Sequence, residues 1–164
     1  MIRPALSALA LIALSPAAIA QDAAPSVAEA QFAQIASWEG RWEVAGTDAL
    51  EIVFTSTARG TVMIERWETA AGLHSMTVYH LDGERVIATH YCPQGNQPRL
   101  ASLPEVGGRI EFAFHDVTGL DEGESHASSL AFVPQQDGSL KRTETYTDLD
   151  GPGSPSTYVL TRAP

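Results

Sequence analysis

The stretch Arg109-Ile110-Glu111-Phe112-Ala113-Phe114 alternates large apolar side chains with polar or small ones at a period of two. This alternation is typical of a β-strand with one face on an apolar core and the other toward water. On both sides of it the chain consists of short runs rich in Val, Ile, Thr, Phe and Tyr. We expect further strands at residues 41–46, 50–57, 61–69, 73–81, 85–92, 98–103, 126–133, 140–148 and 157–162.

Turn signals separate these runs; they are Ala58-Arg59-Gly60, Ala71-Gly72, Asp82-Gly83, Gly107-Gly108 and Asp137-Gly138. Short strands joined by tight turns predict an all-β fold, an antiparallel up-and-down barrel of about eight to ten strands. A closed barrel also leaves no strand edge exposed. Segment 149–156, rich in Pro and Gly, is expected to be an irregular loop before the last strand.

The Asp-Gly turn joins two of these strands into a hairpin in which a two-residue turn would place His80 opposite Arg85. Tyr79 and His90 then share one face of the hairpin, and Tyr91 lies on the other. The pattern leaves open which of the two faces lines the barrel interior.

A short helix is expected before the barrel. Ser26-Val27-Ala28-Glu29 matches a capping box, in which the Ser26 side chain and the Glu29 side chain each accept from the other residue's amide. Apolar residues at near-helical spacing follow, and Gly40 is expected to end the helix. Residues 21–39 are therefore interpreted as a leader and helix, and residues 40–164 as the barrel domain.

Composition excludes several classes of protein. The chain has 164 residues, 44% of them hydrophobic and 18% charged, so it is too short for two domains and too apolar for a disordered chain. Its single cysteine, Cys92, excludes a disulfide scaffold and a CxxC zinc module. No later stretch is apolar enough to span a membrane.

The first 20 residues are predicted to be a secretory signal peptide. Basic Arg3 precedes an apolar run, and the small-residue site Ala18-Ile19-Ala20 precedes Gln21, so cleavage is expected after Ala20. The mature protein is then expected to be periplasmic or secreted. Without Arg3 it keeps 9 basic and 20 acidic side chains, a formal charge of −11, which makes nucleic acid a poor partner.

Two segments resemble known families. Gly40-Arg41-Trp42 near the start of the barrel and Arg162 in the last strand resemble the residues that close calycin barrels such as lipocalins. The resemblance implies that Trp42 packs against Arg162, a contact that gains about 0.5–2 kcal/mol as a cation–π pair. The paired cysteines of lipocalins are missing here.

The second segment combines Tyr79-His80-Leu81-Asp82-Gly83 with Thr89-His90-Tyr91-Cys92, continuing through Gly95-Asn96-Gln97-Pro98-Arg99. It is similar to a segment of uncharacterised exported bacterial proteins of lipocalin-like type. This likeness implies a fold and a compartment but no assigned activity.

The first functional hypothesis is an exported binding protein that holds a small apolar or amphipathic ligand in the barrel lumen, without covalent chemistry. The candidate ligand-binding residues are Trp67, Tyr79, His90, Tyr91, Asn96 and Arg99. For Trp67 the alternative is core packing. For Arg99, which could grip a carboxylate with its bidentate fork, the alternative is an ion pair with one of the protein's own acids.

Other classes of function stay open, and the sequence names no cofactor. Haem or metal could be bound by a barrel histidine, the candidates being His74, His80, His90, His115 and His126. An enzyme could use Cys92 as nucleophile with His90 as base, although no catalytic residue is assigned. A structural or interaction protein is the fourth class, favoured if the barrel holds no cavity and has an apolar outer patch.

Overall fold

The computed structural model describes residues 24–104 and 107–164; the predicted signal peptide lies outside the described residues. The elements are α1 (Val27–Ala36), β1 (Gly40–Val44), β2 (Leu50–Thr57), the 3-10 turn η1 (Ala58–Gly60), β3 (Val62–Thr69), β4 (Gly72–Asp82), β5 (Arg85–Tyr91), β6 (Gln97–Ser102), β7 (Ile110–Thr118), β8 (His126–Pro134), β9 (Leu140–Asp148), β10 (Gly151–Pro152) and β11 (Ser156–Arg162).

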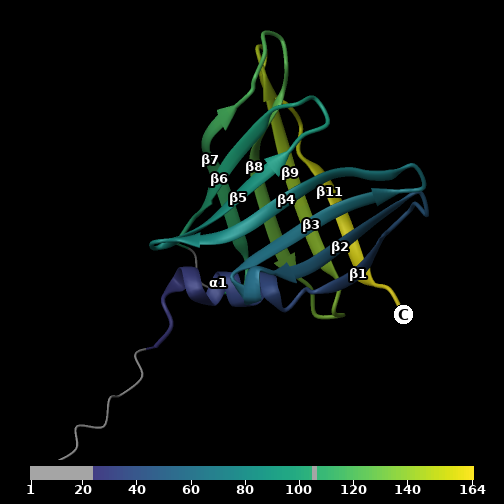
Figure 1. Cartoon of the computed structure of the whole chain (residues 1–164). Coiled ribbons are helices and arrows are strands. Elements are labelled where there is room, and N and C mark those ends of the chain that lie inside the picture. Colours follow the sequence, from purple (N-terminus) through teal and green to yellow (C-terminus); the bar gives the residue numbers. More distant parts are fainter. Residues whose placement is uncertain (1–23, 105–106) are drawn as a thin grey trace, which may run out of the picture.

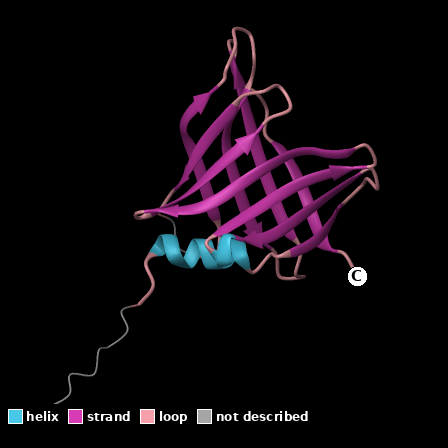
Figure 2. Ribbon diagram, in the orientation of Figure 1, coloured by secondary structure: helices cyan, strands magenta, loops and turns pink. Residues whose placement is uncertain are grey.

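The strands form a closed antiparallel barrel, as the alternation and the turns predict (Figures 1 and 2). Ten of them follow one another around the wall in the order β9-β11-β1-β2-β3-β4-β5-β6-β7-β8, and β8 pairs back with β9 to close it. The two-residue β10 pairs only with β9.

Because successive strands run in opposite directions, their connections alternate between the two ends of the barrel. Helix α1 lies across one of them, which we call the helix end (Figure 2). The other end, which we call the mouth, is formed by loops 45–49, 70–71, 92–96, 119–125 and 149–155. The described residues contain no helix with the length and hydropathy needed to cross a membrane.

The two ends of the chain meet at the helix end. Trp42 of β1 is the register partner of Arg162 of β11, and the guanidinium carbon lies 4.7 Å from the centre of the indole ring. Arg162 also donates to the carbonyl oxygens of Ser37, at 2.7 Å, and Glu39, at 2.9 Å. The predicted contact of Trp42 with Arg162 is therefore confirmed.

Gly40 makes this close approach possible. Its φ of +128° lies in the region that favours glycine, and a Cβ there would lie 3.2 Å from Nη1 of Arg162.

The apolar core closes the helix end of the barrel and continues along the interior, where it includes Trp67, Tyr79, Leu100 and Leu130. Phe32 and Ile35 of α1 pack against strand side chains, and the buried cluster includes Trp38, Trp42, Ile52, Phe54, Met63, Val86, Ile110, Phe112, Phe132 and Leu140. Gln31 fastens α1 to the barrel by donating to the carbonyl oxygen of Leu103 at 2.7 Å. This end is therefore packed shut.

Local details depart from the sequence-based expectations in three places. The capping box of Ser26 and Glu29 is present, but the helix ends at Ala36, and Gly40 begins β1 instead of ending the helix. The expected loop at 149–156 includes β10, in which Pro152 sits at the end of a two-residue ladder.

The third departure is the hairpin register. His80 faces Ile87 and not Arg85, because the turn is formed by residues 83–84, with Gly83 in its first position at φ +57°. The register slips by two residues, an even number, so the predicted division into faces still holds.

Replacing Arg162 with alanine should lower the free energy of unfolding by about 2 kcal/mol, because the cation–π contact and two charge-assisted hydrogen bonds are lost. Chemical denaturation measures the change. Lys141→Ala is the matched control, since Lys141 is an exposed outward side chain at the same end of the barrel. Equal stabilities of the two variants would contradict this role for Arg162.

Candidate functional site

Strand β9 brings charge into the barrel. After the buried Leu140 at its start, its residues are polar on both faces, with Lys141, Thr143 and Thr145 outward and Arg142 and Glu144 inward. Every barrel strand turns alternate residues inward, so a strand without an apolar face must place polar groups inside. Arg142 is accordingly only 1% exposed.

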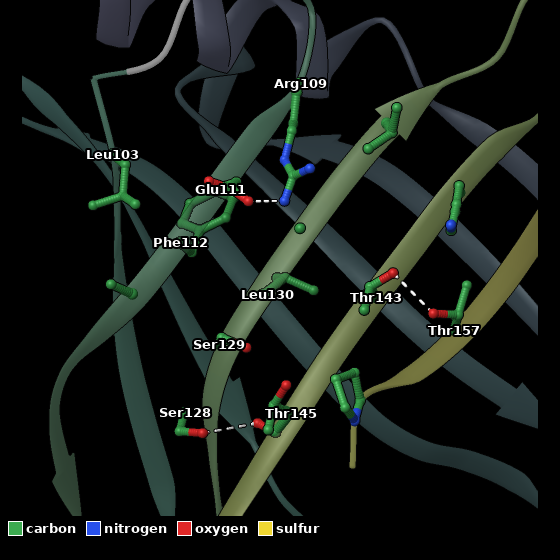
Figure 3. A pocket seen from close by; sticks show the side chains of 15 residues that line it. Leu103, Arg109, Glu111, Phe112, Ser128, Ser129, Leu130, Thr143, Thr145 and Thr157 are labelled. Carbon is green, nitrogen blue, oxygen red and sulfur yellow. Dashed lines mark hydrogen bonds and ion pairs between the residues drawn. The ribbon is translucent and has the colours of Figure 1, made fainter. Parts of the chain in front are cut away.

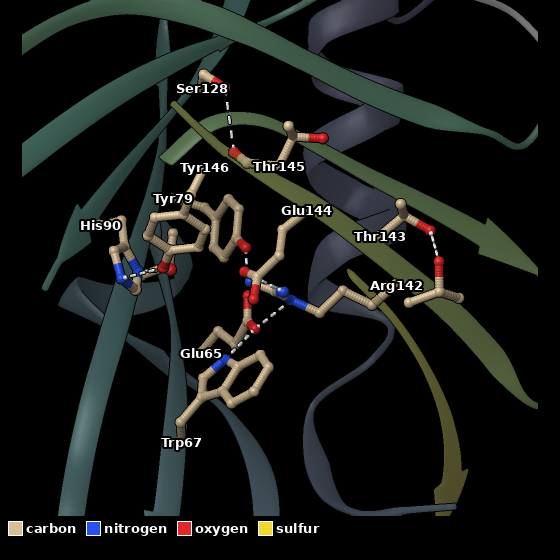
Figure 4. Close-up of polar contacts among 12 residues, drawn as sticks. Glu65, Trp67, Tyr79, His90, Ser128, Arg142, Thr143, Glu144, Thr145 and Tyr146 are labelled. Carbon is tan, nitrogen blue, oxygen red and sulfur yellow. Dashed lines mark hydrogen bonds and ion pairs between the residues drawn. The ribbon is translucent and has the colours of Figure 1, made fainter. Parts of the chain in front are cut away.

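Arg142 lies between two carboxylates (Figure 4). Its Nη1 donates to Oε2 of Glu144 at 2.7 Å, and its Nε lies 2.7 Å from Oε1 of Glu65. The Nε–H bond is not directed at that oxygen, so the contact with Glu65 is an ion pair without a hydrogen bond. Burial opposes the guanidinium charge, but Glu65 and Glu144 outweigh it and raise the pKa of Arg142. We call these three residues the charged triad.

Glu65 is held by neighbours from its own strand and from β4. The indole Nε1 of Trp67 donates to Oε1 at 2.7 Å, and the hydroxyl of Tyr79 donates to Oε2. Trp67 also lies under Arg142, whose guanidinium carbon is 4.6 Å from the indole ring centre, and edge-on to Tyr158. Glu65 is fully buried, and both of its oxygens are occupied.

His90 lies beside the triad on β5. Its Nδ1 is hydrogen-bonded to the hydroxyl of Thr77 at 3.0 Å and its Nε2 to the hydroxyl of Tyr146 at 3.3 Å. Burial and the nearby Arg142 charge lower the pKa of His90, although Glu65 and Glu144 oppose this shift. The imidazole is therefore neutral at pH 7.

The tyrosines around the triad are also neutral. Burial, followed by the charge of Glu65, raises the pKa of Tyr79 well above its usual value. Burial and Glu144 raise the pKa of Tyr146 and Tyr158 in the same way. The hydroxyls in this half of the barrel therefore act as neutral donors or acceptors.

A small cavity of about 10 Å³ adjoins the triad. It is lined by Thr77, His90, Leu100, Ala127, Ser129, Leu130, Arg142 and Glu144. A space of this size holds about one water molecule, whereas pockets for drug-sized ligands measure about 300–1,000 Å³. Side chains therefore fill most of this part of the barrel.

A larger groove of about 520 Å³ lies on the outer face of β7, β8, β9 and β11 (Figure 3). Small outward side chains such as Ala113 and Ala131 form its floor. Two pairs of its polar side chains bond to each other: Thr143 to Thr157 at 3.0 Å, and Arg109 to Glu111.

The six residues predicted from sequence separate into three groups. Trp67, Tyr79 and His90 face inward beside the charged triad, which resolves the open question of which hairpin face is inside. Tyr91, 42% exposed, points outward, and so does Arg99.

Arg99 forms a bidentate ion pair with Asp116, one of the two alternatives that the sequence left open. Asn96 is buried in the 92–96 turn, where Nδ2 donates to Glu124 Oε2 and to the Ser125 carbonyl, each at 3.1 Å. It ties two mouth loops together.

The metal hypothesis and the hypothesis of Cys92 as a nucleophile each require particular side chains to lie together. Within residues 24–104 and 107–164 no group of three or more His, Cys, Asp or Glu side chains could hold a metal ion. Both ring nitrogens of His90 are taken by Thr77 and Tyr146, so neither is paired with the half-buried thiol of Cys92.

Sequence reasoning missed Arg142, Glu144 and Tyr146. The sequence feature that could have identified them is segment 141–148, which is polar on both faces although the chain is predicted to form a barrel.

Comparison with known proteins adds no identification, since neither a family model nor a curated protein matches this chain.

His90→Asn should flatten the dependence of stability on pH. Because the folded-state pKa of His90 lies below its ordinary value of 6.5, the unfolded chain takes up the proton first as pH falls, and stability is lost below pH 6.5. The drop in unfolding free energy from pH 7.5 to 5.5 should be smaller in the variant, by up to about 1.4 kcal/mol. His80→Asn, on the outer face, is the control. Equal drops in the unfolding free energy of wild type and His90→Asn would contradict the lowered pKa assigned to His90.

Proposed function

We propose that this chain is an exported, lipocalin-like binding protein that carries a small amphipathic molecule in the mouth half of its barrel, without covalent chemistry. Export would use residues 1–20 as a cleaved signal. The observation that carries the proposal is the charged triad of Glu65, Arg142 and Glu144, buried in the interior beside a cavity.

The triad is hard to explain as a source of stability. Removing charges from water costs several kcal/mol for each ion, and replacing a buried ion pair with apolar residues is often neutral or stabilising. Apolar side chains already fill most of the buried interior. Charged and hydrogen-bonding groups gathered beside a cavity are typical of a ligand site.

Entry of a ligand requires side chains at the mouth to move, because the present cavity has room for about one water molecule. Tyr146 and Tyr158 are only partly buried, and Tyr158 is the register partner of Arg142, so their rings are the side chains to rotate outward. Trp67, Leu100 and Leu130 would then supply apolar walls, and Glu144 and His90 the polar contacts.

The outer groove is the weaker candidate although it is larger. Two pairs of its polar side chains bond to each other on an open surface, Thr143 with Thr157 and Arg109 with Glu111. A ligand there would have to compete with water for groups that already have partners.

Two alanines of β8 allow the interior and the groove to be distinguished. Ala127 lines the interior cavity and Ala131 lines the groove. Native mass spectrometry of the protein, purified without denaturation from its own compartment, should show an added small-molecule mass that denaturation removes. Ala127→Leu should abolish the added mass because it fills the cavity, and Ala131→Leu should retain it.

The mass of the polypeptide without the bound molecule should also match a chain that begins at Gln21. Circular dichroism confirms that each variant is folded. A second interior variant is Thr77→Val, which removes a hydroxyl from the cavity without adding volume. Wild-type protein without an added mass, or loss of that mass in Ala131→Leu alone, would contradict the proposal.

A further inference from the structure

The charges inside the barrel do not balance. Glu65 and Glu144 supply two carboxylates and Arg142 a single guanidinium. The other titratable side chains against this cluster, His90 and the tyrosines, are neutral. One formal negative charge is thus left over, on the side of Glu144, whose side chain is the more exposed of the two carboxylates at 12%.

The mouth carries the same sign of charge. Its loops 45–49, 70–71, 92–96, 119–125 and 149–155 contain Asp48, Asp121, Glu122, Glu124 and Asp150 and no lysine or arginine. Six basic side chains lie toward the helix end instead, namely Arg41, Arg59, Arg85, Arg109, Lys141 and Arg162. Arg66 and Arg99, nearer the mouth, are paired with Glu68 and Asp116. A cation approaching the mouth therefore meets an attractive field, and an anion a repulsive one.

The mouth also exposes apolar side chains. Leu73 at the start of β4 is 56% exposed and Leu149 in the 149–155 loop is 82% exposed, and Leu120 in the 119–125 loop is also exposed. Acidic groups interleaved with apolar ones would accept a ligand that has both a positive charge and an apolar part.

We infer that the ligand of the proposed site is a small organic monocation, an amphipathic amine, whose ammonium group binds at Glu144 and whose apolar part lies toward Leu73 and Leu149. The inference rests on the proposed function. The ammonium supplies the missing positive charge, and the partly buried rings of Tyr146 and Tyr158 lie close enough to Glu144 for a cation–π contact with it.

Three probes that share one skeleton test the inference: 2-phenylethylamine, 2-phenylethanol and phenylacetate, which are positive, neutral and negative at pH 7. Calorimetric titration of the mature protein at low salt should show the amine binding at least about tenfold more tightly than the alcohol, and no binding of phenylacetate. Glu144→Gln should reduce the affinity for the amine about tenfold or more and leave that for the alcohol unchanged. Glu43→Gln, an exposed outward carboxylate on β1, should change neither.

Equal affinities for amine and alcohol, tighter binding of phenylacetate, or an effect of Glu43→Gln equal to that of Glu144→Gln would overturn the inference and leave the carrier proposal standing. A neutral or anionic molecule that co-purifies with the wild type would also overturn the inference and leave the carrier proposal standing. Failure of the carrier proposal has a separate signature, since no added mass is then found on the wild-type protein.

Discussion

The contact between Arg142 and the carboxylates of Glu65 and Glu144 is the constraint around which the barrel interior is arranged. A guanidinium at 1% exposure is tolerable only if its charge is compensated in place. Trp67 and Tyr79 fix Glu65, so the compensating charge cannot move away from Arg142. The positions of two aromatic side chains thus follow from one buried ion pair.

Closure of the sheet makes this arrangement possible. Because β8 pairs with β9 and Trp42 packs against Arg162, the interior is shielded from water at the helix end. The apolar cluster of the interior can therefore pack densely. In the proposed function, the apolar cluster serves stability and the buried charges serve binding. The apolar cluster supplies the buried area that holds the fold together, and the charges of Glu65, Arg142 and Glu144 lie against part of it.

The parts of the fold that could be predicted from sequence depend on local chemistry. The capping box of Ser26 and Glu29 and the shared face of Tyr79 and His90 in one hairpin need only residues close in the chain. The contact of Trp42 with Arg162 was predicted instead from the resemblance to calycin barrels, since no local pattern connects the two ends of the chain. The hairpin register was missed because Gly83, and not Asp82, takes the first turn position.

The site was predictable only in part. Trp67, Tyr79 and His90 were named, but alternation does not say which face is inside, so Tyr91 was named with them. Arg142 meets Glu65 through pairings of the closed sheet that no spacing in the sequence reveals.

The most direct test of the account is a charge-free interior. Glu65→Gln, Arg142→Met and Glu144→Gln together remove all three charges, while the amide oxygen introduced by Glu65→Gln can still accept from Trp67. Denaturation and native mass spectrometry of this triple variant should show a barrel at least as stable as wild type that no longer carries its small molecule. A variant that unfolds, or one that keeps the molecule, would contradict the claim that the buried charges serve binding and not stability.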